Sequence, residues 1–257
     1  MKLLIRKIGL AIHLLHERAY TFWKVRETGV HFLEPLNYNE RAFFLEFQQA
    51  LLGDNLVVYD IGAASGVVSR CFAKLSNVRT VHSFEPIPSA FTDLTERTQQ
   101  YPQVTRHNVA LGDENCVMDI HIAEGSRDSS SLLRMKQLHK KEFPNVSYKD
   151  HPEKVSMVRL DDYVRDNHLP LPHTVKIDVQ GYEDRVLRGG KDTISQTAYC
   201  ILEISIAQLY ESSPLFDDIY LQMREMGFRL VGLGGILRGV SGHYMQLDGI
   251  FQNLRCI

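Results

Sequence analysis

The chain has 257 residues, 44% of them hydrophobic, and a formal net charge of −2. This length can bury one substantial core, so one large α/β domain with an N-terminal extension is expected rather than two equal domains. The charge argues against a nucleic-acid partner held by a globally basic surface. Four cysteines form no C-x-x-C pair, and two of them, Cys71 and Cys200, fall in predicted core elements. This usage favours reduced thiols and a cytoplasmic protein over a disulfide framework.

A basic amphipathic helix is predicted for residues 2–26, where apolar residues recur at helical spacing. Residues 1–30 carry six Lys or Arg and two Glu, a charge of +4, which leaves −6 for the rest. The longest uncharged run, residues 8–16, is too short to span a bilayer, and no cleavage site follows it. Three interpretations stay open: a helix packed on the domain, a homodimer contact, or peripheral docking on the inner face of the membrane.

A strand that ends in a glycine turn is predicted next. An apolar run at residues 56–61 leads into Gly62 and Gly66 and then into a helical pattern. Gly62 can adopt backbone angles closed to other residues, and Gly66 lets the following helix pack closely. Asp60 stands at the end of the strand, where a carboxylate can accept hydrogen bonds from an ammonium or hydroxyl group. The pattern therefore predicts a small-molecule site at this turn.

A second acid, Glu85, ends the next predicted strand, residues 80–84. It lies nineteen residues after Gly66, where an acid meets ribose hydroxyls in nucleotide-binding folds. Dinucleotide enzymes need G-x-G-x-x-G, but the residue two past Gly62 is Ala64. The spacing D-x-G-x-x-x-G favours a single nucleoside that carries an amino acid, S-adenosylmethionine, over a nicotinamide cofactor.

Strands and helices alternate along the rest of the chain. Helices are expected at residues 38–52, 89–100, 161–167, 182–188 and 215–226, central strands at 104–110, 173–179 and 199–204, half-buried antiparallel strands at 116–123 and 155–160, and a closing strand pair at 228–233 and 245–253. This order predicts an α/β fold with a mostly parallel seven-stranded sheet, helices on both faces and a closing antiparallel hairpin. Residues 1–54 are expected to form the N-terminal helical extension, and residues 55–257 the main domain.

The polar segment 124–154 interrupts this alternation. Structureless stretches of this length are unusual unless they are functional, so a lid over the ligand site is expected, with a plain surface excursion as the alternative. A glycine-rich link at residues 232–244 carries His243, which could serve as a base.

Two further acids, Asp178 and Glu203, lie at or near the ends of strands expected to be neighbours, about 4.8 Å apart. Their carboxylates can converge on one acceptor hydroxyl or on one divalent cation, since two carboxylates and waters satisfy Mg²⁺. The open alternatives are direct contact of a carboxylate with substrate, a metal site at Asp178 and Glu203, and a structural role for one of the two.

Several motifs together resemble the FkbM family of S-adenosylmethionine-dependent methyltransferases, within the Rossmann-like class I methyltransferases. They are Asp60-x-Gly62-Ala63-x-x-Gly66, Phe84-Glu85-Pro86, Asn108-x-Ala110-Leu111, Leu160-Asp161-Asp162, Lys176-Ile177-Asp178-x-x-Gly181-x-Glu183 and Asp248-Gly249-Ile250-Phe251, and the resemblance covers roughly residues 57–253. It implies that the turn from Asp60 to Gly66, Ala63 included, holds the methionine part of the cofactor, that Glu85 accepts the ribose, and that Asn108 and Ala110 form a wall of the adenine pocket.

The sequence departs from the resemblance at two positions: the family often has Asn in place of Ala64 and commonly Glu in place of Gln180. The family's members methylate hydroxyls, so the resemblance implies O-methylation of a small-molecule acceptor, a sugar, polyketide or related metabolite. The alternatives are a scaffold protein that binds S-adenosylmethionine without turnover and a nicotinamide-dependent oxidoreductase.

Overall fold

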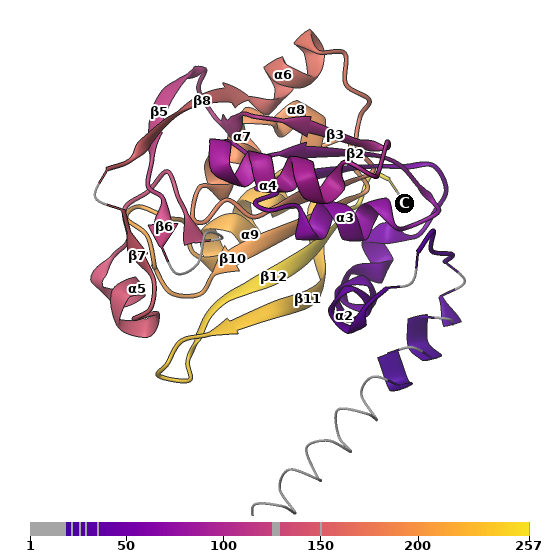
Figure 1. The fold of residues 1–257 in the computed structure, drawn as a ribbon, viewed down its shortest axis with the longest axis horizontal. Helices are drawn as coiled ribbons and strands as arrows, with labels where there is room; N and C mark the ends of the chain where they lie inside the picture. Colours follow the sequence, from indigo (N-terminus) through magenta and orange to yellow (C-terminus); the bar gives the residue numbers. More distant parts are fainter. Residues whose placement is uncertain are drawn as a thin grey trace, which may run out of the picture.

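The computed structural model describes residues 19–256, apart from residues 22, 26, 29, 35, 125–128 and 150. Its centre is a seven-stranded sheet of strand order β11-β12-β10-β9-β1-β2-β3, with helices on both faces (Figure 1). The run from β10 to β3 is parallel, and β12 and β11 add an antiparallel hairpin at one edge. The predicted α/β fold is confirmed.

The bounds of the elements are as follows. The sheet contains β1 (Leu56–Ile61), β2 (Val78–Phe84), β3 (Val104–His107), β9 (Thr174–Ile177), β10 (Tyr199–Ser205), β11 (Phe228–Arg238) and β12 (Tyr244–Asn253). The helices are α2 (Tyr38–Phe47), the 3-10 helix η1 (Gln48–Leu51), α3 (Val67–Ala73), α4 (Pro88–Thr98), α5 (Gln137–Glu142), α6 (Leu160–Asp166), α7 (Glu183–Gly189), α8 (Lys191–Ile194) and α9 (Phe216–Glu225). A three-stranded sheet joins β4 (Ala110–Gly112), β8 (Glu153–Arg159) and β5 (Cys116–Ile120), and β6 (Ala123–Glu124) pairs with β7 (Ser147–Tyr148).

Strand β1 is buried on both faces, which explains its continuous apolar run. Alternate residues point to opposite sides of the sheet: Tyr59 packs in the cluster that contains residues of α7 and α9, and Val58 packs in the cluster that contains residues of α2 and α3. Cys71 in α3 and Cys200 in β10 are buried, as predicted.

Two predicted elements have different bounds in the structure. The expected strand 104–110 is split: β3 pairs with β2, whereas β4 pairs with β8 in the smaller sheet. The side chain of Asn108, which lies between the two strands, donates to the backbone carbonyls of Glu85 and Pro86 in the turn after β2. The expected glycine-rich link 232–244 is mostly strand, because β11 continues to Arg238 through register shifts around its glycines. The hairpin therefore projects beyond the other strands (Figure 1).

The polar segment 124–154 is not structureless in its described part. It forms α5 and β7, and Met135 bridges to Tyr210 and packs with it in a small apolar cluster. The carbonyl oxygen of Glu142 in α5 accepts the N–H of Val240 at the hairpin tip, at 3.1 Å. The segment is thus attached to the hairpin.

Most of the predicted N-terminal helix, residues 2–26, lies outside the described residues. Its described positions, 19–21 and 23–25, are helical, and Val25 packs in the same core cluster as α2 and α3. Among the residues that the structure describes, no helix is long and apolar enough to cross a membrane.

Candidate functional site

A pocket opens beyond the carboxyl ends of β1, β2 and β9. It is lined by residues 61–65, 84–87, 109–111, 130–132, 176 and 178–180, together with parts of α3 and β5. The empty space within it, part of which is open to solvent, is about 950 Å³. Strand β1 lies between β2 and β9, so the chain connections leave in opposite directions there, which is where ligands bind in open α/β sheets.

Gly62 and Gly66 both have a positive φ and a close neighbour that leaves no room for a Cβ. Gly62 has φ +82°, and a Cβ there would lie 1.9 Å from the carbonyl oxygen of Asp178. Gly66 has φ +79°, and a Cβ there would lie 2.7 Å from Cδ1 of Leu94 in α4. The predicted tight turn at Gly62 is present, and the close approach at Gly66 is to α4. Gly62 also brings the β1 turn into direct contact with the chain after β9.

Glu85 connects the turns that follow β1 and β2. Its Oε2 accepts the N–H of Ala64 at 2.9 Å, its Oε1 accepts the N–H of Ile87 at 2.8 Å, and the residue is 4% exposed. An ionised carboxylate is an acceptor of hydrogen bonds, the kind of group that binds ligand hydroxyls. Glu85, the residue expected to accept the ribose, lines the pocket.

Ala63 and Ala110 line the pocket, and Asp60 and Asn108 do not. Asp60 is fully buried, and its Oδ2 accepts a 2.5 Å hydrogen bond from Ser69 in α3. Burial raises the pKa of the Asp60 carboxyl. Asn108 donates to the carbonyl oxygens of Glu85 and Pro86 at 2.8 and 3.1 Å. Both residues support the turns of the pocket from outside it.

Asp178 brings a carboxylate into the pocket wall. Its side chain is 30% exposed, and Lys176 Nζ donates to its Oδ2 at 2.9 Å. Lys176 also lines the pocket and is otherwise buried. Burial alone would lower the pKa of the Lys176 ammonium, but the carboxylates of Asp178, Asp60 and Asp248 outweigh it and raise that pKa. Lys176 is therefore a permanent cation beside Asp178.

Glu203 lies on the strand next to Asp178, as predicted, because Leu202 of β10 pairs with Ile177 of β9. The two carboxylates do not touch. The Nε2 atom of Gln180 donates to Oδ1 of Asp178 at 2.9 Å and to Oε2 of Glu203 at 2.7 Å. Burial and the neighbouring carboxylates raise the pKa of Glu203 well above its usual range. Glu203 is not among the residues that line the pocket.

This arrangement does not fit the predicted Mg²⁺ site at Asp178 and Glu203. Mg²⁺ requires oxygen ligands in an octahedral arrangement, whereas an amide N–H₂ group lies between these carboxylates. Within the described ranges, no three His, Cys, Asp or Glu side chains are grouped so as to hold a metal ion.

His243 lies apart from these residues. It is exposed at the tip of the β11–β12 hairpin, its Nδ1 is 3.2 Å from Oγ of Ser241, and it does not line the pocket. The sequence interpretation missed Lys176 as a site residue, although it precedes Asp178 by two positions and so shares its side of the strand.

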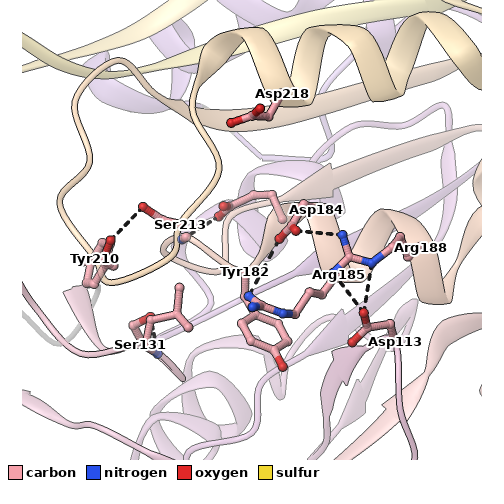
Figure 2. Close-up of polar contacts among 12 residues, drawn as sticks. Asp113, Ser131, Tyr182, Asp184, Arg185, Arg188, Tyr210, Ser213 and Asp218 are labelled. Carbon is pink, nitrogen blue, oxygen red and sulfur yellow. Dashed lines mark hydrogen bonds and ion pairs between the residues drawn. The ribbon is translucent and has the colours of Figure 1, made fainter.

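Helix α7 fixes the chain that follows Asp178. Figure 2 shows Arg188 between two carboxylates: its Nη1 donates to Asp184 at 2.7 Å and its Nε to Asp113, in the turn after β4, at 2.9 Å. The guanidinium of Arg185 stacks 4.5 Å from the centre of the Tyr182 ring. These contacts hold the loop of residues 178–182 in place.

Comparison with known proteins agrees with this geometry. The Methyltransferase FkbM domain matches residues 60–230, two thirds of the chain. The chain belongs to the FkbM methyltransferase family.

Two curated relatives match part of this FkbM chain. The 2-O-methyltransferase NoeI of Sinorhizobium fredii is 32% identical over 160 residues, which cover 60% of this chain and 65% of NoeI. The hexuronic acid methyltransferase AglP of Haloferax volcanii is 25% identical over 153 residues, which cover 58% of this chain and 55% of AglP. The matched part thus spans less than two thirds of either relative.

A solved structure of the methyltransferase FkbM from Methylobacillus flagellatus KT superposes on 80% of this chain and 47% of its own, with 17% identity and a TM-score of 0.49.

Proposed function

We propose that this protein transfers a methyl group from S-adenosylmethionine to a hydroxyl group of a sugar or related metabolite. The observation that carries the proposal is that the glycine turn after β1 and the carboxylate of Asp178 line the same pocket, with Gly62 packed against the carbonyl of Asp178. Family membership supports the reaction class. The names of the relatives, a 2-O-methyltransferase and a hexuronic acid methyltransferase, favour a sugar hydroxyl over a polyketide.

The pocket residues fit the parts of this cofactor. The Glu85 carboxylate, which lines the pocket, would accept the ribose hydroxyls. The apolar stretch from Val109 to Leu111 would form one side of the adenine pocket, and Ala63 and its neighbours would contact the methionine part. The bound cofactor would supply a methyl group activated by a sulfonium. Reduced cysteines favour a cytoplasmic site of action.

Asp178 is the proposed proton acceptor for the hydroxyl. Lys176 and Gln180 each donate to one of its oxygens, so the carboxylate is held in a fixed orientation with further lone pairs open. Methyl transfer is an in-line displacement, so the main task of the protein is to align the acceptor oxygen. The acceptor oxygen would take the methyl group as the carbon–sulfur bond breaks and leaves its electron pair on sulfur, and the hydroxyl proton would pass to Asp178. Mg²⁺ has no part in this proposal, since the Gln180 amide lies between the two carboxylates.

The test is formation of S-adenosylhomocysteine from S-adenosylmethionine in the presence of hexuronic acids and their glycosides, followed by mass spectrometry. Turnover with a methylated sugar product is expected. Calorimetry separates the alternatives: binding of NAD instead of S-adenosylmethionine indicates an oxidoreductase. Binding of S-adenosylmethionine without turnover of any acceptor indicates a scaffold.

Asp178→Asn tests the role of the carboxylate, because it keeps the shape and removes the charge. We expect turnover to fall by about a hundredfold or more, as for a lost general base, with little change in cofactor affinity. Calorimetry with S-adenosylmethionine is the control for folding. Full activity in this variant would remove Asp178 from the mechanism.

A further inference from the structure

Gln180 makes more polar contacts than any role assigned so far explains. Its side chain is 8% exposed at the pocket wall, and its backbone has φ +55°, in the left-handed region. Besides the two bonds from Nε2 to Asp178 and Glu203, its Oε1 accepts the hydroxyl of Tyr210 at 2.7 Å. Its backbone carbonyl accepts Oγ of Ser131 at 2.6 Å. Four separate stretches of chain therefore meet at this one residue.

The contacts favour one orientation of the amide. Tyr210 is buried and directs its hydroxyl at Oε1, so the N–H₂ group faces the carboxylates. If the amide were turned over, its oxygen would face two carboxylates and both of its bonds to them would be lost. Each proton of Nε2 is donated to one carboxylate. The amide nitrogen therefore lies between Asp178 and Glu203, where a cation that bridged them would have to lie.

The surroundings of the two carboxylates differ. Asp178 also has Lys176 and reaches the pocket, whereas Glu203 has the amide of Gln246, at 2.5 Å, and lies opposite Asp248 on β12. By donating to both carboxylates, Gln180 connects Asp178 to Glu203 on β10. The remaining lone pairs of Asp178 stay directed at the pocket.

We propose that the Gln180 carboxamide takes the place of a divalent cation: it bridges Asp178 and Glu203 and orients Asp178 toward the acceptor hydroxyl, so that methyl transfer needs no metal. Gln180 is a positioning residue, since it acts through Asp178. The expected effects on kcat rest on the proposed function. The expected effects on Mg²⁺ binding do not, because binding is measured without turnover.

The first test compares Gln180→Met with Gln246→Met, which removes an amide from Glu203 without touching Asp178. Gln180→Met is expected to lower kcat by about tenfold to a hundredfold, as for groups that orient a reacting side chain, with KM for S-adenosylmethionine unchanged. Gln246→Met is expected to lower kcat less. Parent turnover should be the same with EDTA and with added MgCl₂. A parental kcat in Gln180→Met, or EDTA inhibition reversed by Mg²⁺, overturns the proposal.

The second test needs no acceptor. Gln180→Glu puts a third carboxylate between Asp178 and Glu203, a set of oxygens that suits Mg²⁺. Calorimetry with MgCl₂ is expected to show binding to Gln180→Glu and none to the parent or to Gln180→Met. Binding of Mg²⁺ to the parent that Asp178→Asn abolishes overturns the proposal. Because this result does not depend on turnover, a failure to find an acceptor affects only the proposed function.

Discussion

Glu85 is a single side chain that joins two turns and lines the pocket, so its removal tests the pocket directly. In Glu85→Ala, hydrogen bonds to the ligand that involve a charged group are lost at a cost of roughly 1.5 to 3 kcal/mol, or about tenfold to a hundredfold in affinity. Calorimetry with S-adenosylmethionine measures this loss.

The control for Glu85→Ala is Glu85→Gln, which keeps one acceptor oxygen for the N–H of Ala64 or of Ile87. We expect it to bind with intermediate affinity. Parental affinity in Glu85→Ala would contradict the assignment of this residue to the ribose.

The backbone at Ala64 explains why Asn, the residue that the family often has there, suits this position. Its φ is +45°, and a residue with a Cβ pays about 1 to 2 kcal/mol there, less if it is Asn. Ala64→Asn is therefore expected to raise the free energy of unfolding by up to about 1 kcal/mol, measured by urea denaturation. Ala64→Val, which is β-branched, should lower it. A less stable Ala64→Asn protein would show that the pocket does not tolerate the longer side chain.

Residues 129–149, the continuous described part of the polar segment 124–154, are hydrogen-bonded to the β11–β12 hairpin. A lid formed by this segment would therefore have to move together with the hairpin. Besides the bond from Val240 to the backbone carbonyl, Oε2 of Glu142 accepts the N–H of Ser241 at 3.0 Å, and hydrogen bonding with Ser241 lowers the pKa of Glu142. If the segment closes over the ligand, the hairpin tip has to move with it. Hydrogen exchange should therefore show protection in both elements when cofactor and acceptor are bound.

Glu142→Ala removes the side-chain half of that link. We expect faster exchange at the hairpin tip, residues 239–243, and ligand-induced protection that is confined to segment 129–149. Unchanged exchange on ligand binding in the parent would reduce the segment to a surface excursion.

At the scale of the whole molecule, two buried histidines make stability depend on pH. Nδ1 of His82 is 3.0 Å from Nε2 of His107, whose Nδ1 contacts the hydroxyl of Tyr163 at 3.1 Å. Burial lowers the pKa of both histidines from 6.5 to about 4. Between these pKa values the unfolded chain binds protons at the two histidines and the folded chain does not. The stability that the neutral histidines contribute is therefore fully present above pH 6.5 and is lost as the pH falls toward 4.

The double variant His82→Phe with His107→Phe removes these titrations and keeps the aromatic stack on Phe84, whose centre is 4.6 Å from that of His107. Urea denaturation at pH 7 and pH 5 should show a smaller loss of stability in the variant than in the parent. Burial raises the pKa of Glu183 and Asp248 to about 7, but these groups titrate in both proteins and cancel in the comparison. Equal losses would contradict the assignment.

Short-range patterns in the sequence determined the sheet, its strand-end acids and the glycine turn. An apolar run and a glycine such as Gly62 are local signals, because strand periodicity and backbone angles depend on neighbours in the chain. For the same reason the sequence predicted that Asp178 and Glu203 lie on adjacent strands, and that Glu85 reaches the pocket.

Only the tertiary structure decided which side chains reach the pocket and which contacts they make with distant parts of the chain. Asp60 sits at the predicted strand end, but Ser69 and the surrounding core bury it below the pocket. His243 falls in the glycine-rich link expected at residues 232–244, whereas pairing with β12 extends β11 to Arg238 and leaves His243 at the hairpin tip, outside the pocket lining. Gln180 has its role through Tyr210 and Glu203, residues thirty and twenty-three positions away. Such contacts depend on how distant segments pack, which no local pattern encodes.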